Sequence, residues 1–211
     1  MRVLEPSERI AEVLFGLIMV LTFTGSLSVA EAGRDDIRAM LIGALGCNVA
    51  WGIIDGLLYL MGCLGERSRG LAVYQGVHGA RDPVRGRRLI ADALPSAIAS
   101  VLEPTDLERM RRRLQGLPKP PGRARLNGSD CQGALGVCLL VVLSTFPVAV
   151  PFIVMENATR ALRASNAIAV AMLFLAGVAY GRAVGWHPWV VGVAMVAVGS
   201  ALVALTMALG G

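Results

Sequence analysis

Long uncharged stretches separate the charged parts of this chain. No charged residue occurs between Gly133 and Met155, or between Pro188 and Leu209. The hydrocarbon core of a bilayer is about 30 Å thick and is crossed by roughly 20 apolar residues of α-helix. These runs are long enough, and they lack the alternation of apolar and polar residues that a transmembrane β-strand requires. The pattern therefore predicts an all-α fold built from membrane-spanning helices.

Five apolar runs are predicted to be spans. In chain order they are Ile10–Ala30, Ala39–Leu64, Gly133–Met155, Ala164–Gly181 and Pro188–Leu209. The first run is followed by charged residues and then by another span, so we interpret it as a retained helix and not as a cleaved signal peptide. The expected architecture is a polytopic membrane protein with five transmembrane helices and a cytoplasmic helical segment between the second and third.

Charge is scarce and unevenly placed. Only 17% of the residues are charged, compared with roughly 25% in a typical soluble domain. Of the 20 Lys and Arg residues, 13 lie between the second and third spans: Arg67, Arg69, Arg81, Arg85, Arg87, Arg88, Arg109, Arg111, Arg112, Arg113, Lys119, Arg123 and Arg125. Because basic residues near the ends of spans stay in the cytoplasm, the N-terminus is expected there and the C-terminus on the outer or luminal side.

This distribution divides the chain into three expected parts. Residues 1–64 hold the first two transmembrane helices, residues 65–131 form a basic cytoplasmic helical segment and linker, and residues 132–211 hold transmembrane helices three to five. A basic segment beside a membrane attracts anionic lipid heads. We expect those lipid heads and the bilayer itself as partners, and no nucleic acid.

Local signals predict two or three short amphipathic helices in the basic segment. Asp82 before Pro83 suits a helix start. Thr105 and Glu108 have the spacing of a capping box, so a second helix is predicted to begin there. It is predicted to stop by Gly116 to Pro118, and the stretch Pro118 to Gly128 to be a mobile linker.

Residues that often carry enzyme or metal chemistry are scattered. The four cysteines form no Cys-x-x-Cys pair, and His78 lies far from His187. No nucleophile is placed beside a base. We therefore expect no enzyme activity, no disulfide, no zinc site and no bound cofactor.

One face of the second span is polar. Asp55 lies about 17 residues into the span, where insertion of a carboxylate costs roughly 2.5–3.5 kcal/mol. Asn48 precedes it by seven residues and Tyr59 follows it by four, so the three share a helical face. Asp55 is either functional or a structural acid hydrogen-bonded to Thr22, Asn48 or Tyr59. Asn48 alone is also explained by helix–helix packing.

The first span carries a comparable stripe. Glu12, Met19, Thr22 and Ser26 are separated by seven, three and four residues, which places them near one face. If this stripe meets that of the second span, it encloses carboxylate, amide, hydroxyl and thioether groups, which suit divalent cations. Each of these residues also has an ordinary explanation. Met19 alone fits apolar packing, and Glu12 alone fits a position at the water interface. The hydroxyls of Thr22 and Ser26 are common where helices pack.

Two prolines interrupt the third predicted span. Pro147 and Pro151 each remove a helical hydrogen bond. Such breaks are tolerated where neighbouring groups satisfy the freed carbonyls or where the backbone lines a cavity. We expect Ser144 and Thr145 to satisfy them.

These features resemble the vacuolar iron transporter family over nearly the whole chain. The stretches similar to that family are GLIMVLTF (Gly16–Phe23), WGIIDGLLYLMG (Trp51–Gly62), FPVAVPF (Phe146–Phe152), LFLAGVAYGRAVG (Leu173–Gly185) and the Gly-rich fifth span. The resemblance implies five spans, a helical cytoplasmic segment after the second, and a homodimer that moves ferrous iron or manganese out of the cytosol.

The resemblance also implies where the transport site lies. The family uses an aspartate in its first span and a methionine in its second, at a dimer interface. Gapless matching places Met19 and Asp55 at these positions, so the pair is exchanged between helices. The family's cytoplasmic segment binds metal through many glutamates, whereas this arginine-rich segment contains only Glu66, Glu103 and Glu108.

The leading hypothesis is a homodimeric, proton-coupled exporter of divalent metal such as iron or manganese. Its expected metal ligands are Met19, Asp55 and Asn48, and the expected proton or pathway residues are Glu12, Thr22, Ser26 and Tyr59. The alternative is a non-transporting membrane scaffold whose basic cytoplasmic segment binds lipid or a partner.

Overall fold

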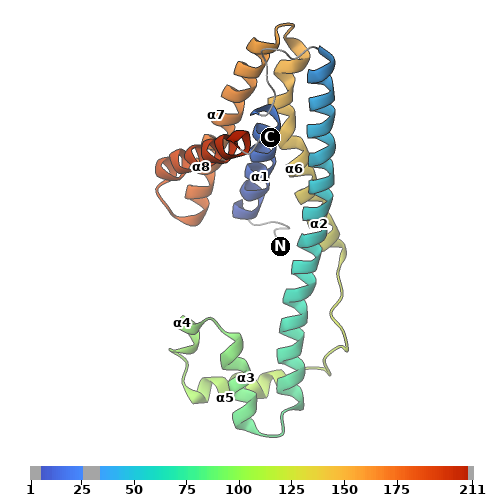
Figure 1. The fold of residues 1–211 in the computed structure, drawn as a ribbon. Coiled ribbons are helices and arrows are strands. Elements are labelled where there is room, and N and C mark those ends of the chain that lie inside the picture. Colours follow the sequence, from blue (N-terminus) through green and yellow to red (C-terminus); the bar gives the residue numbers. More distant parts are fainter. Residues whose placement is uncertain (1–5, 26–33, 209–211) are drawn as a thin grey trace. The chain divides into compact units, whose positions relative to one another are not determined.

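The structure is a computed structural model that describes residues 6–25 and 34–208 (Figure 1). Every regular element in this part of the chain is a helix: α1 (Pro6–Gly25), α2 (Arg34–Gly79), α3 (Pro83–Ala93), α4 (Ser96–Ala99), α5 (Pro104–Gln115), α6 (Gly128–Val154), α7 (Ala158–Val184) and α8 (Pro188–Ala208). The prediction of an all-α fold is confirmed.

Three of these helices are long and apolar enough to cross a membrane. They cover Ile37–Gly79, Gly128–Val154 and Ala158–Val184. Shorter apolar helices cover Ile10–Met19 and Pro188–Leu202 in the described residues. The chain is therefore a membrane protein with transmembrane helices, while its first and fifth spans stay predictions.

The chain forms two compact units. The first unit joins the part before Leu60 to the part from Ser129 onward, and the second unit contains Leu60–Gly128. The long helix α2 contributes its apolar part to the first unit and its polar part to the second. The second predicted span was expected to end at Leu64, but the helix continues to Gly79.

Helix α1 supplies the centre of the first unit. Its buried residues Leu14, Leu17 and Leu21 form a core with Val148 of α6 and with three residues of α7, which are Ala169, Leu173 and Ala176. Helix α1 also contacts α8, and α7 packs along α8 (Figure 1). The leucine face of α1 therefore lies inside the bundle of helices, whereas Glu12 and Met19 are half-buried.

Glycines allow α2 to pack closely on α6. A Cβ atom at Gly52 would lie 2.9 Å from the carbonyl oxygen of Cys138, and one at Gly56 would lie 3.0 Å from that of Ala134. Small residues permit such close backbone approach in lipid, where van der Waals packing contributes much of the attraction. This face of α2 is the face that carries Asn48 and Asp55.

Helix α6 continues through Pro147 and Pro151. Ser144 and Thr145 donate to the carbonyls of Val141 and Val142, one turn earlier, so they do not satisfy the carbonyls that the prolines free. The hydroxyl of Ser165 on α7 donates to the Val148 carbonyl of α6, at 2.7 Å, and so links the two helices between the prolines. The prolines free the carbonyls of Leu143 and Pro147, four residues before each, and the hydroxyls of Ser144 and Thr145 bond to other carbonyls, so that expectation was wrong.

Helix starts in the second unit follow their local signals with one shift. The Asp82 carboxylate accepts from the backbone N–H of Val84, at 3.0 Å, and α3 begins at Pro83 as predicted. Helix α5 begins at Pro104, and its capping box pairs Glu103 with Asp106. Pro104 explains the shift from the predicted box at 105–108, because a proline needs no hydrogen-bond partner at the first helical position. Helix α5 ends at Gln115, as predicted.

The segment after α5 is tied to α2. We predicted a mobile linker from Pro118 to Gly128, and it contains no helix before Gly128. Three side chains of α2 donate hydrogen bonds to its backbone carbonyls: Tyr74 to Pro118, Gln75 to Pro121 at 2.7 Å, and Arg67 to Arg125 at 2.8 Å. The linker therefore follows α2 within the second unit.

Candidate functional site

Two carboxyl groups meet inside the first unit. Asp55 of α2 and Glu12 of α1 are hydrogen-bonded to each other through their side chains. A hydrogen bond between two carboxyl groups forms only when one of them carries a proton, because an ionised carboxylate has no proton to donate. Two carboxylates at such short range cannot readily both be ionised. The structure therefore brings Glu12, an expected pathway residue, to Asp55, an expected metal ligand.

Buried polar atoms without partners lie on the same face of α2. Asn48 is 1% exposed, and neither atom of its amide group is hydrogen-bonded to a described residue. The Oδ2 atom of Asp55 is buried and also has no such partner. A buried polar group without a hydrogen bond costs about 1–3 kcal/mol. A cation or water that bonded to these atoms would remove that cost.

The expected metal ligands lie at two levels along the helices. Seven residues of helix rise about 10 Å, so Asn48 and Asp55 are too far apart to bind one ion together. Helices α1 and α2 run antiparallel (Figure 1), which places Met19 on the same side of the carboxyl pair as Asn48. Along the helix axes, Met19 and Asn48 therefore both lie to one side of Glu12 and Asp55.

Tyr59 extends the polar series toward the start of α6. A Cβ atom at Gly133 of α6 would lie 2.5 Å from the phenol oxygen of Tyr59, so the ring lies directly against that glycine. Asp130 is one turn before Gly133 and is only 5% exposed. Sequence reasoning missed Asp130, because an acid at the start of a helix is ordinarily a solvated group near the positive end of the helix dipole.

Two other residues of the predicted set are not placed by the structure. Thr22 belongs to α1, but its side chain lies outside the described part, and Ser26 lies in the interval from 26 to 33, outside the described residues. Among the described residues, no three His, Cys, Asp or Glu side chains cluster in a way that could hold a metal ion. A cation site at Glu12 and Asp55 would therefore rely on these two carboxyl groups, with the Asn48 amide and the Met19 thioether at a separate level.

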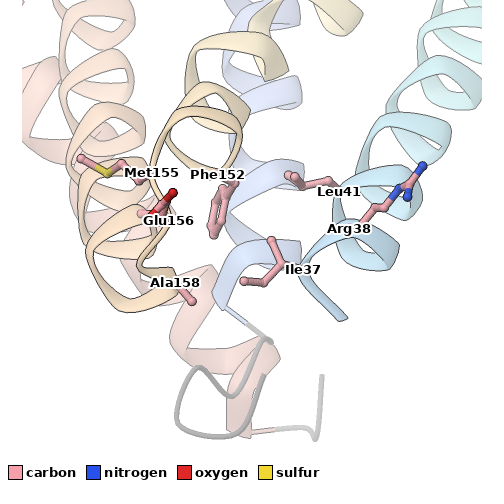
Figure 2. Close-up of a pocket in the computed structure, with 8 residues that line it drawn as sticks. Ile37, Arg38, Leu41, Phe152, Met155, Glu156 and Ala158 are labelled. Carbon is pink, nitrogen blue, oxygen red and sulfur yellow. The ribbon is translucent and has the colours of Figure 1, made fainter. Parts of the chain in front are cut away.

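A separate cavity of about 380 Å³ lies near the beginning of α2. Figure 2 shows Phe152 between Glu156 and the α2 residues Ile37 and Leu41, with Arg38 on the far side. Asp55 follows Leu41 by 14 residues, or about 21 Å of helix. This cavity is therefore distinct from the carboxyl pair.

The second unit has its own charge cluster. The Glu108 carboxylate accepts hydrogen bonds from Arg111 at 2.7 Å and from Arg112 at 2.9 Å, and it lies 3.5 Å from Arg87. The hydrogen bonds from Arg111 and Arg112 lower the pKa of Glu108 to about 2. One acid is thus surrounded by three guanidinium groups, an environment that repels cations.

Comparison of the whole chain with models of protein families found no match, and comparison with curated proteins found none either.

Proposed function

We propose that this protein transports a divalent cation across its membrane, with Glu12 and Asp55 as the central cation and proton site. The observation that supports this most is the hydrogen bond between these two half-buried carboxyl groups, together with the buried Oδ2 atom of Asp55 that has no described partner. Ionisable groups within a membrane are costly and commonly mark a pathway for ions or protons.

The pair suits exchange of a cation for a proton. With one proton, the two carboxyl groups share a hydrogen bond and carry a single negative charge. When the proton leaves, the two negative charges balance a bound divalent cation. Carboxylate oxygens suit hard cations such as Mn²⁺, and the Met19 thioether at the next level favours softer ions such as Fe²⁺.

Asn48 and Met19 supply a second cation-binding position along the proposed transport pathway. The amide oxygen of Asn48 is buried and needs a partner, and a partly dehydrated cation would provide one. Tyr59 and Asp130 continue the polar series from Asp55 to the start of α6. The arginine-rich segment precedes this end of α6, so this end is predicted to face the cytoplasm. The proposed direction is export, as in the transporter family that the sequence resembles.

Flux in reconstituted vesicles tests the proposal. Purified protein would be placed in liposomes, with a metal-sensitive dye and a pH dye inside. Asp55→Asn keeps the shape and removes the charge, so metal flux should disappear. Glu12→Gln keeps a donor to Asp55 but holds no exchangeable proton, so metal flux should lose its coupling to pH. Met19→Leu should change mainly which metal is preferred.

Asp92→Asn is the matched control. Asp92 is an exposed acid on α3, so its loss should leave flux unchanged. Thermal unfolding in detergent would establish that each variant is folded. Normal metal flux through a folded Asp55→Asn variant would rule out the central role of this residue. If the wild-type protein also carries no metal, the scaffold alternative becomes the better explanation.

The family resemblance further suggests a homodimer. Crosslinking of the protein in membranes, through single cysteines placed along α1, should trap two copies. A protein that stays monomeric in both detergent and bilayer would contradict this part of the proposal.

A further inference from the structure

A cavity in the second unit is lined by arginines. It has a volume of about 670 Å³ and lies between the polar part of α2 and the segment from Pro121 to Arg125. Its charged lining residues are Arg67, Arg123 and Arg125, and no acidic residue lines it. Ligand-binding pockets commonly have volumes of about 300–1,000 Å³, so the cavity could hold a small anionic group.

Two hydrogen bonds define the cavity. The side-chain amide of Gln75 donates to the Pro121 carbonyl at 2.7 Å, and the Arg67 guanidinium donates to the Arg125 carbonyl at 2.8 Å. Gln75 and Arg67 are eight residues apart, or about 12 Å along the helix. The segment from Pro121 to Arg125 runs between these two hydrogen bonds. Leu71 lies on α2 midway between Arg67 and Gln75 and gives the cavity an apolar wall.

The chemistry of the lining favours phosphate. Guanidinium groups present planar pairs of donors that match two oxygens of one phosphate. Arg123 and Arg125 are exposed, so their side chains can reach an incoming ligand. Arg67 is oriented by its bond to the Arg125 carbonyl. A phosphate bound by these three residues would gain charge-assisted hydrogen bonds from two sides of the cavity.

The position of these arginines along the chain indicates where the phosphate comes from. Arg67 follows Leu64, the last residue of an apolar run, by three residues, and Arg125 precedes the start of α6 at Gly128 by three. Three residues rise about 4.5 Å in the helix that carries Arg67, and the non-helical chain from Arg125 to Gly128 spans at most about 10 Å. Arginines so near the ends of transmembrane helices lie at the depth of lipid headgroups.

We propose that this cavity binds the phosphate group of an anionic lipid, with the arginines bonding to the phosphate oxygens and Leu71 contacting the adjoining carbon chain. The site is independent of the transport proposal. Dissolved phosphate carries the same chemistry, and the two sources are separable by experiment.

Native mass spectrometry of the full-length protein in detergent tests the site. The protein would be titrated with phosphatidic acid, with phosphatidylcholine, and with phosphatidic acid in the presence of inorganic phosphate. Wild-type protein should retain phosphatidic acid in preference to phosphatidylcholine. Arg123→Gln/Arg125→Gln leaves the Arg67 bond to a backbone carbonyl possible, and it should weaken retention of phosphatidic acid about tenfold or more.

Arg85→Gln/Arg88→Gln is the matched control. Both arginines are exposed on α3 and lie outside the cavity, and the control removes the same charge. It should retain phosphatidic acid within about twofold of wild type, since diffuse charge contributes little at moderate salt. Equal loss in both double variants would overturn the site in favour of general electrostatic attraction. So would wild-type protein that does not distinguish phosphatidic acid from phosphatidylcholine. Displacement of the lipid by inorganic phosphate at similar concentration would overturn the lipid source.

Discussion

Close contacts with glycine determine how the polar residues are held. Tyr59 lies against Gly133, and Gly52 and Gly56 bring α2 onto α6 along the same face. A larger residue at any of these positions would push α2 away from α6. The position of Asp55 therefore depends on residues that take no part in chemistry.

Gly133→Ala tests this dependence. The added methyl group would lie 2.5 Å from atoms of the Tyr59 ring, which must move. Overpacking of this kind typically costs about 1–3 kcal/mol, and the unfolding temperature in detergent should fall. Gly46→Ala is the control, because apart from the local backbone of its own helix no described atom lies within 4 Å of a Cβ there. It should be neutral or slightly stabilising.

Tyr59→Leu shows whether the loss of stability in Gly133→Ala comes from the clash with the Tyr59 ring or from another contact. In the Tyr59→Leu background the ring is gone, so Gly133→Ala should cost much less than in wild type. Equal costs in both backgrounds would show that the contact with Tyr59 is not the cause.

At the scale of elements, α5 is held to α3 through one carboxylate. Glu108 bonds to Arg111 and Arg112 on its own helix and lies near Arg87 on α3. Its pKa is lowered to about 2, from a usual value of 4.5, chiefly by the hydrogen bonds from these two arginines. A carboxyl group with a lowered pKa stabilises the fold above its usual value and stops doing so as the pH falls through the folded value.

The expected result is that α5 loosens between about pH 4.5 and pH 2. Hydrogen exchange of α5 amides, corrected for the intrinsic effect of pH on exchange, measures this. Glu108→Gln should flatten the response, and Asp92→Asn on α3 should keep it. Since Glu108 is partly exposed, the effect is expected to be modest. An unchanged response in Glu108→Gln would mean that another group controls the transition.

Helix ends with local signals were largely predictable, and contacts between helices were not. The carboxylate of Asp82 caps α3 because its partners are two and three residues away. The support that Ser165 gives to the proline-containing helix crosses between helices, and no local pattern encodes it. The pairing of Glu12 with Asp55 has the same origin: periodicity predicted both polar faces, but not which residues would face each other.

At the scale of the whole molecule, the distribution of arginines predicts on which side of the membrane each loop lies. Three helices are long enough to span, and the shorter α1 and α8 complete the five spans that we propose. With the N-terminus in the cytoplasm, the segment before α6 is cytoplasmic and the connection from α6 to α7 is on the outer side.

Cysteine labelling in intact cells measures this arrangement. The native cysteines would first be replaced by alanine or serine. Gly122→Cys should resist a membrane-impermeant maleimide until the cells are opened, whereas Glu156→Cys should react at once. Both positions are exposed, so access and not burial decides the result. Labelling of Gly122→Cys in intact cells would reverse the topology.

The amide of Asn48, which has no described partner, implies a conflict between folding and the proposed transport. A residue chosen only for stability at a site that is 1% exposed would be apolar, yet the chain carries an amide without a described partner there. Asn48→Leu should therefore raise the unfolding temperature, because it removes a cost of about 1–3 kcal/mol, while it slows metal flux. A random library selected only for heat resistance should accumulate such changes along the proposed path. Positions where substitutions raise the unfolding temperature and lower the metal flux would then mark the residues that line the proposed pathway. This identification does not require that the transported ion be known.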